Sequence, residues 1–172
     1  MEFPKSGNTA RYYPPVGFHF EVRILDSYEA GGMAMSALGL SADVDGSFQE
    51  VSGISVQMPT EDFYEGGENR FAYKLPMPVK YTNLLLKRGL VSSVSALGEW
   101  CKETFELGLD RPIMTKHVMV SLLNENQHPL IGWVFIGAFP TKWNVSNFNA
   151  ENSTIAIETL ELSYRRFEQV NV

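Results

Sequence analysis

The sequence predicts a mainly β fold: an antiparallel β-barrel or sandwich with one packed α-helix at about residues 92–108. Several segments alternate apolar and polar residues with a period of two, which is typical of strands with one buried face. A single segment, with strands before and after it, carries apolar residues at helical spacing. The length of 172 residues suits one domain. We expect an N-terminal arm at 1–15 and one barrel domain at 16–172, with an inserted loop at 26–46.

Composition and charge exclude several classes of protein. Hydrophobic residues make up 44% of the chain and charged residues 20%, as in globular proteins. No apolar run reaches the roughly 20 residues of a membrane-spanning helix. The start, MEFPKSGNTARYYPP, lacks the apolar stretch of a secretion signal. A net charge of −6 argues against binding to nucleic acid, whose phosphates attract basic surfaces. The single cysteine, Cys101, excludes an internal disulfide.

The first half of the chain predicts strands separated by two long irregular segments. After Pro14 and Pro15, which cannot donate to a ladder, the run from Phe18 to Ile24 alternates as a half-buried strand. The 26–46 segment contains a Gly-Gly pair and breaks this pattern, so we read it as an inserted loop. A second strand is expected at 48–58, followed by an acidic turn at 61–69.

The middle of the chain predicts two more strands and the helix. A strand at 70–75 is expected to end before Pro76, and another at 81–90 is apolar on both faces around Leu84–Leu86. Ser92 or Ser93 is a candidate helix cap, and Gly108 and Pro112 are expected to end the helix. The predicted helix core consists of Val94, Leu97, Trp100, Cys101 and Phe105.

Three further strands are predicted in the last third of the chain. They cover residues 113–123, 130–139 and 154–167, and Pro140 is expected to end the second of them. In the last of these strands, the apolar residues change from one face of the strand to the other near Glu158–Thr159. This change predicts either a bulge or a strand whose two faces are buried by different partners.

No group of residues predicts catalysis or a metal or cofactor site, so we do not expect an enzyme. The histidines His19, His117 and His128 are scattered, and Cys101 lies on the apolar stripe of the helix, where a buried thiol is expected. The fragment from Asp43 to Glu50 lacks the ligand spacing of a calcium loop.

Five stretches of the chain, in order, resemble the tail tube proteins of contractile-tail phages and extracellular contractile injection systems. They are PPVGFHFEVRI (14–24), FQEVSGISVQMPTEDFYEGG (48–67), LPMPVKYTNLLLKRGL (75–90), MVSLLNENQHPLIGWVFIGAFPTKW (119–143) and IAIETLELSYRRF (155–167). Together with the intervening helix, the resemblance covers about four-fifths of the chain. The Hcp proteins of secretion systems are more distant relatives of this family.

The resemblance implies a structural protein that forms hexameric rings with a shared inner barrel. These rings would stack into a hollow tube inside a contractile sheath. Implied partners are other copies of the chain, a sheath subunit, baseplate or spike proteins, and effector cargo in the lumen. The protein would assemble in the bacterial cytoplasm into a phage tail-like particle. Two alternatives remain: a baseplate-proximal tube initiator of the same fold, and a soluble β-rich binding module.

Candidate assembly residues follow from this reading. A ring satisfies sheet borders by pairing them between copies, and a large barrel leaves a lumen filled with water. Polar strand positions are therefore candidates for the lumen: His19, Glu21, Arg23, Asn83 and Lys87. The long acidic segment is the predicted element for stacking rings, through Glu61, Asp62, Tyr64, Glu65 and Glu68. Its contact would weaken with salt. The 26–46 insertion is expected to contact another ring, the sheath or the baseplate.

Overall fold

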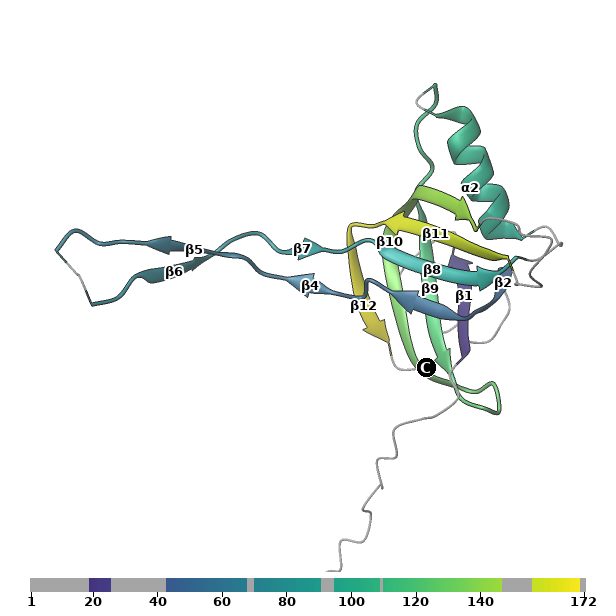
Figure 1. Cartoon of the computed structure of the whole chain (residues 1–172), viewed down its shortest axis with the longest axis horizontal. Helices are drawn as coiled ribbons and strands as arrows, with labels where there is room; N and C mark the ends of the chain where they lie inside the picture. Colours follow the sequence, from purple (N-terminus) through teal and green to yellow (C-terminus); the bar gives the residue numbers. More distant parts are fainter. Residues whose placement is uncertain are drawn as a thin grey trace, which may run out of the picture.

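The computed structural model describes residues 19–25, 43–67, 70–90, 95–108, 110–146 and 156–170. They form a barrel-like body, from which a long two-stranded arm projects on the side away from the helix (Figure 1). The mainly β fold class, with antiparallel sheets and one helix, is confirmed.

One sheet, here called sheet 1, has the strand order β2-β1-β9-β10-β12. All its pairings are antiparallel. Its strands are β2 (Asp43–Phe48), β1 (His19–Leu25), β9 (Lys116–Leu123), β10 (Pro129–Val145) and β12 (Arg166–Val170). In β1 the inward positions Val22 and Ile24 are buried and alternate with outward polar residues, which agrees with the period of two in the sequence.

The second sheet, sheet 2, has the order β10-β11-β8-β3 and crosses in front of sheet 1 (Figure 1). It adds β11 (Ile157–Ser163), β8 (Leu84–Gly89) and β3 (Glu50–Ser52). The long strand β10 belongs to both sheets, and only Gln49 separates β2 from β3. The Gln49 N–H donates to the Lys87 carbonyl at 2.9 Å, so one continuous segment pairs with β1 and then with β8 and closes the barrel.

The barrel interior is an apolar core to which both sheets and the helix contribute. Burial of these side chains is the main stabilising contribution to the fold. The fully buried members include Val22, Leu84, Leu86, Leu97, Cys101, Val118, Val120, Phe135, Leu160 and Leu162. Phe135 and Tyr164 form an edge-to-face pair at 4.9 Å between ring centroids near the base of the arm.

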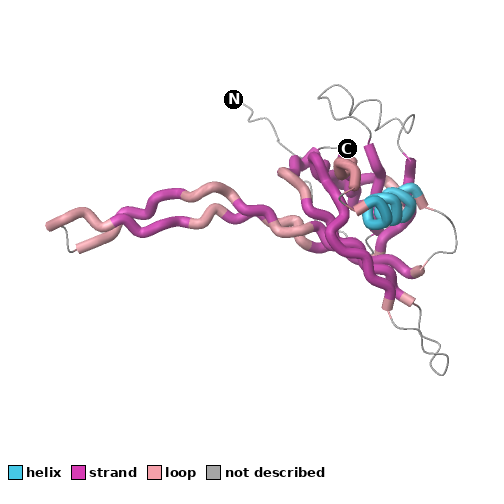
Figure 2. The backbone as a smooth tube through the Cα atoms, turned by 90° about the horizontal axis from the view of Figure 1, so that it is seen from above, coloured by secondary structure: helices cyan, strands magenta, loops and turns pink. Residues whose placement is uncertain are grey.

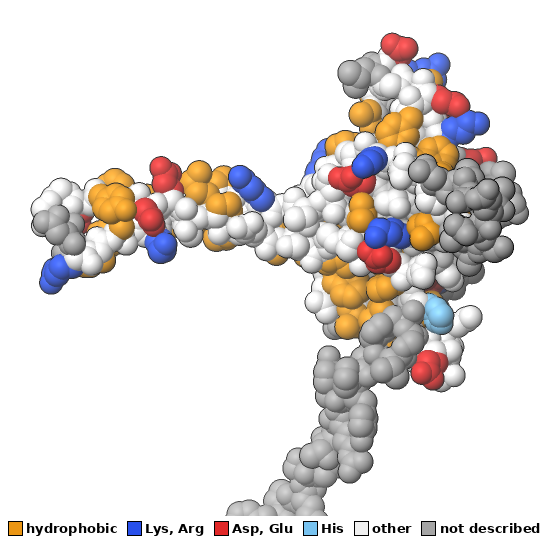
Figure 3. Space-filling view, viewed as in Figure 1, with side chains coloured by type: hydrophobic (Ala, Val, Ile, Leu, Met, Phe, Trp, Pro, Cys, Tyr) orange, Lys and Arg blue, Asp and Glu red, His pale blue; other side chains and the backbone are white. Residues whose placement is uncertain are grey.

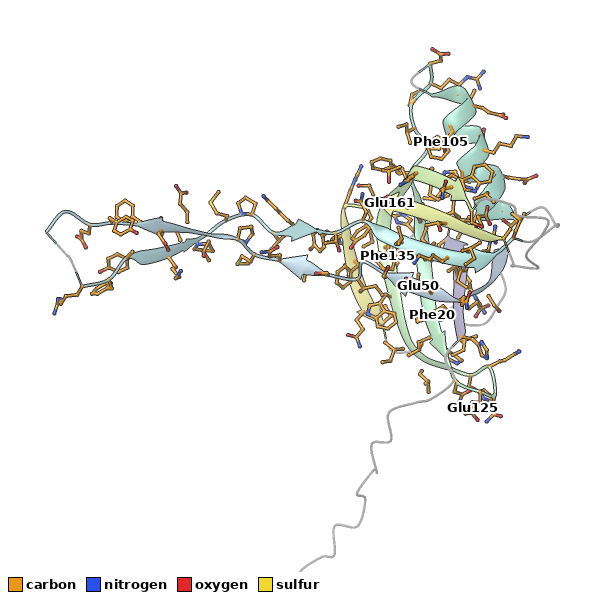
Figure 4. The ribbon with its side chains drawn as sticks, viewed as in Figure 1. Phe20, Glu50, Phe105, Glu125, Phe135 and Glu161 are labelled. Carbon is orange, nitrogen blue, oxygen red and sulfur yellow. The ribbon has the colours of Figure 1, made fainter. Side chains whose placement is uncertain are left out.

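The helix α2 (Ala96–Leu107) packs the residues of its first two turns against this core. Its N-cap is Ser95, whose Oγ accepts from the Gly98 N–H at 3.1 Å, so the expected cap at Ser92 or Ser93 is wrong. Phe105 was expected on the packed stripe but is 44% exposed, because the last turns of α2 extend beyond the barrel (Figure 4). Val94 lies outside the described residues.

The arm is a ribbon built from two consecutive antiparallel ladders (Figure 2). Near the body, β4 (Val56–Gln57) pairs with β7 (Lys80–Tyr81). Further out, β5 (Thr60–Phe63) pairs with β6 (Tyr73–Pro76). The segment at 61–69, expected as a turn, therefore begins within a strand. The strand that was expected to end before Pro76 includes this proline as its last residue.

Three other expectations need correction. The inserted loop does not reach residue 46, because Asp43–Phe48 is a strand. Residues 26–42 and the expected N-terminal arm at 1–15 lie outside the described residues. Strand β10 continues through Pro140, since its pairing with β9 ends at Ala138 and no donor is needed on that side. The register of β11 is continuous at Glu158–Thr159, where Glu158 occupies the inward phase.

Gly53 determines where the chain leaves β3 for the arm. Its φ is +87°, and its carbonyl accepts from Thr82 Oγ1 at 2.7 Å and from the Tyr164 hydroxyl at 3.3 Å. A Cβ at this position would lie 1.9 Å from the backbone oxygen of Asn83. The base of the arm therefore requires glycine on both steric and conformational grounds.

We expect Gly53→Ala to lower the free energy of unfolding by more than about 2 kcal/mol, because it adds a backbone clash to a positive φ. Gly66→Ala is the matched control, since a Cβ there meets nothing within 4 Å. Urea unfolding followed by tryptophan fluorescence measures both variants. Equal stability of the two would contradict this account of the arm base.

Candidate assembly surfaces

The outer border of β12 is a candidate for pairing between copies. Within the described residues, β12 pairs only with β10, in a register from Gly132 opposite Val170 to Ile136 opposite Arg166. Its other side therefore presents backbone N–H and C=O groups without a ladder partner from the described strands. Such a border is a template for adding a further strand.

The outward face of sheet 1 carries three of the predicted lumen residues. His19, Glu21 and Arg23 alternate with the buried positions of β1, and the Glu21 carboxylate accepts from Arg23 at 2.9 Å. Together with residues of β2 and of the β9–β10 turn, they line a hollow of about 610 Å³. This part of the face is polar and concave.

The same face also has an apolar part, which the sequence reading missed. Leu25, Met119, Val134 and Val170 form a second buried cluster, separate from the barrel core. Cross-strand pairing places Met119 between Arg23 on β1 and Val134 on β10. The signal was present in the sequence, because β9 has apolar residues at both phases.

Asn83 and Lys87, the other two lumen candidates, lie on the β8 side of the barrel rather than with His19. Lys87 faces away from the core and is bound to Glu50 at 2.9 Å, and Asn83 donates to Glu161 at 2.7 Å. Glu50 and Glu161 lie at the front of the barrel in Figure 4, over sheet 2, whereas β1 lies behind. The five candidates therefore do not share one surface.

The predicted stacking residues lie on the outer half of the arm. Tyr64 is 73% exposed, and Glu61 and Glu65 are exposed as well. Asp62 forms an ion pair with Lys74 across the ladder at 3.3 Å, so part of the acidic charge is neutralised within the arm. Glu68 lies outside the described residues.

A buried polar network joins α2 to the barrel. Arg88 and Glu158 lie directly opposite each other on β8 and β11, with side chains that are each 6% exposed and 2.6 Å apart. Glu158 also accepts from Trp143 Nε1 at 2.7 Å, and Arg88 donates to the Ser95 cap oxygen at 2.8 Å. The Arg88 guanidinium lies over the Phe48 ring, 5.1 Å from its centroid.

The bend between β11 and β12 lies beside Gly137 of β10, whose φ is +63°, and the Arg165 N–H in the bend donates to the neighbouring Ile136 carbonyl at 3.0 Å. The Gly137 N–H donates to His117 Nδ1 at 3.2 Å, and the Arg165 side chain packs against Gly137. Burial lowers the pKa of His117, and the nearby positive charge of Arg165 lowers it further. The imidazole is therefore neutral near pH 7 and can accept this hydrogen bond.

The described residues offer no arrangement for metal or thiol chemistry. No group of three or more His, Cys, Asp or Glu side chains among them could hold a metal ion. Cys101 is fully buried in the core. None of the described helices is long and apolar enough to span a membrane.

Solved structures share this architecture. A chain in the cryo-EM structure of the anti-feeding prophage (AFP) baseplate matches with a TM-score of 0.69 and 27% identity, covering 92% of this chain and 97% of that one. A chain of the PVC sheath–tube complex, an extracellular contractile injection system, matches with a TM-score of 0.69 and 23% identity, with coverages of 94% and 95%. An Hcp protein shares the fold at a TM-score of 0.52 and 14% identity, with coverages of 91% and 93%. No curated protein matches significantly in sequence.

Within the described residues, a closed antiparallel barrel with one packed helix and a projecting arm is the architecture of a structural protein of the tail tube class. A family model assigns it further: residues 16–168 match the T4-like virus tail tube protein gp19. The chain belongs to this family, which confirms the resemblance found in the sequence.

The Arg88–Glu158 pair yields a prediction about stability. Glu158→Ala leaves the Arg88 charge buried without its partner, and we expect a loss of about 3–5 kcal/mol in the free energy of unfolding. Glu50→Ala is the matched control, because it breaks the exposed pair with Lys87 and should cost under about 1 kcal/mol. Chemical denaturation checks both, and similar losses would show that the buried network is not stabilising.

Proposed function

We propose that this protein is a non-enzymatic structural subunit of the inner tube of a contractile injection system or phage-like tail. Copies would form hexameric rings, and the rings would stack into a conduit for envelope penetration and effector passage. The observation that carries the proposal is the outer border of β12, which has no ladder partner among the described strands, in a barrel of the tail tube family.

The borders of sheet 1 support the proposed ring. That sheet ends at β12 on one side and at β2 on the other. Sheet 2 ends at β10, which it shares with sheet 1, and at β3, which is joined to β2 of sheet 1 through Gln49. Pairing β12 of one copy along the β2 border of the next would continue the sheet. This contact is head-to-tail, and it closes into a ring when the rotation between copies divides a full turn.

The continued sheet gives the ring its inner wall. The polar, concave part of the outward face of sheet 1, with His19, Glu21 and Arg23, is the proposed lumen surface. Asn83 and Lys87 are on sheet 2 and would face away from the lumen.

Partners beyond the ring are proposed from the family. The arm would reach the next ring, and the outside of the tube would contact a sheath subunit, as in the PVC complex, whose sheath and tube were solved together. Baseplate or spike proteins would bind at one end of the tube. The segment at 26–42 remains a proposed contact with a ring, the sheath or the baseplate. Assembly in the bacterial cytoplasm would precede release or anchoring of the particle.

A baseplate-proximal tube initiator is the second candidate. The match at 27% identity to a chain of the AFP baseplate structure favours it. The two roles differ in copy number, because a shaft subunit repeats along the tube whereas an initiator occupies one ring. Cryo-EM of intact particles with this chain located in the density would distinguish them.

Self-assembly of the purified chain tests the proposed function directly. We expect light scattering to show hexamers or longer polymers that form with rising concentration, and negative-stain images to show rings with a central hole. A monomer at every concentration would support a soluble binding module instead.

The β12 border can be tested with two single variants, Glu168→Pro and Gln169→Pro. Neighbouring strand residues direct their N–H groups to opposite sides, so one proline removes a donor to β10 and the other removes a donor to the free border. We expect the variant with the smaller drop in melting temperature to lose ring assembly. If that variant forms rings as well as the unmodified chain does, β12 is not the pairing border.

A further inference from the structure

Strand β10 passes from sheet 1 to sheet 2 through a β-bulge at Ile136–Gly137. The register between β9 and β10 shifts between Phe135 and Ala138, so two residues of β10 lie opposite the single residue His117 of β9. Strand β10 pairs with β12 up to this bulge and with β11 beyond it. A bulge bends its strand and increases the local twist. The geometry of this bulge therefore determines how one sheet turns into the other.

The His117 side chain acts as a hydrogen-bond acceptor within the bulge. The Gly137 N–H donates to His117 Nδ1 at 3.2 Å. A backbone N–H is always the donor, so Nδ1 must carry a lone pair, which it has only in the neutral imidazole. This hydrogen bond therefore exists only while His117 is uncharged.

The same bulge also holds the start of β12. The Ile136 carbonyl accepts from the Arg165 N–H at 3.0 Å, and Ile136 pairs with Arg166, the first residue of β12. The Arg165 side chain lies close over Gly137, since a Cβ at Gly137 would be 3.1 Å from Arg165 Cδ and 3.2 Å from Arg165 Nε. A displacement of the bulge would therefore move the bend and the first residue of β12 with it.

Protonation of His117 would add a positive charge to a basic group of side chains. Strand β10 contributes no charged side chain near the bulge. The carboxylates of β12 and β1 are bound by arginines of their own strands, at 3.0 and 2.9 Å respectively. On the face of the barrel in Figure 3, by contrast, basic and acidic side chains are intermixed, as in the Lys87–Glu50 pair. The described charged residues on the elements around His117 are Lys116 of β9, Arg165 of the bend, Arg166 and Glu168 of β12, and Arg23 and Glu21 of β1.

Apolar neighbours make this charge still less favourable. His117 lies directly opposite Leu25 across the β1–β9 ladder, and Leu25 and Met119 belong to the second buried cluster, against which Ile136 packs. Opposite residues of a ladder share a face, so the imidazole borders that cluster. Burial in this place, and second the Arg165 charge, lower the pKa of His117.

The sign of the pH dependence follows from this lowered pKa. An unfolded chain binds the proton with the ordinary histidine pKa of about 6.5, whereas the folded chain binds it less readily. The stability that neutral His117 contributes is therefore complete above about pH 6.5 and is lost as the pH falls toward the lowered value.

From the bulge geometry we propose that His117 is a pH-sensitive positioning residue for the β12 border. In its neutral form it holds the bulge of β10 and, through the Arg165 bend, the start of β12 in the arrangement that pairs with the next copy. In its protonated form it cannot accept from the Gly137 N–H, so the bulge is released and pairing at β12 weakens. This inference rests on the proposed function, because it concerns the border that the proposed ring uses.

Two matched single variants test this role. His117→Asn removes the titration and keeps an acceptor, because the asparagine side-chain oxygen can replace Nδ1. His128→Asn makes the same change at an exposed histidine of the β9–β10 turn. Assembly is measured by analytical ultracentrifugation at about pH 7.5 and about pH 5.5, a range in which carboxylates of ordinary pKa stay ionised. Near-UV circular dichroism at both pH values verifies that the barrel is folded.

We expect the concentration for half-maximal assembly of the unmodified chain to be at least about threefold higher at the lower pH, because the fraction of chains competent to pair falls as His117 is protonated. His128→Asn should show the same pH dependence. His117→Asn should assemble at both pH values as the unmodified chain does at the higher one. His117→Leu, which has no acceptor, should assemble weakly at both.

The outcomes separate this inference from the proposed function. If the unmodified chain assembles equally well at both pH values, or if His117→Asn keeps the full pH dependence, the role of His117 is wrong and the tube function stands. Loss of the near-UV signal of the unmodified chain at the lower pH would contradict a local release of the bulge. If the unmodified chain remains monomeric at every concentration at the higher pH, the proposed function fails, and this inference fails with it.

Discussion

Backbone hydrogen bonding at the sheet borders is the constraint on which the rest of this structure depends. The chain satisfies most of it internally, because a single segment on either side of Gln49 pairs with β1 and with β8 and closes the barrel. Among the described strands of sheet 1, the outer sides of β12 and of β2 have no ladder partner. The same rule that forms the barrel favours a further strand at these borders.

Closure of the barrel makes the body a suitable unit for a ring. A sheet that closes on itself and is covered at one end by α2 has little freedom to change its curvature, so in the proposed ring the body would set the angle between neighbouring copies. The Arg88–Glu158 pair contributes to this rigidity, because it connects β8, β11, Trp143 of β10 and the cap of α2. Burying two charges has a desolvation cost, and the hydrogen bonds to Trp143 and Ser95 offset part of it.

The sequence correctly predicted those elements whose formation depends on residues close together in the chain. The alternation of β1 and the apolar stripe around Leu97 and Cys101 identified a strand and a helix that the structure contains. The predictions were wrong where pairing with a strand distant in sequence determines the structure. Pro140 does not end β10 because β9 stops at Ala138, and Arg88 and Glu158 are buried because β8 and β11 place them face to face. Neither fact can be read from neighbouring residues, and the cap Ser95 is likewise bound by Arg88 of the distant strand β8.

The structure has two kinds of exposed strand, β12 of the body and the strands of the arm, and they offer a neighbour different chemistry. Pairing at β12 fixes register and direction, because hydrogen bonds are directional and strand pairs have discrete registers. The arm, whose borders carry prolines, cannot compete for that pairing, so a subunit with two kinds of exposed strand is protected from joining them wrongly.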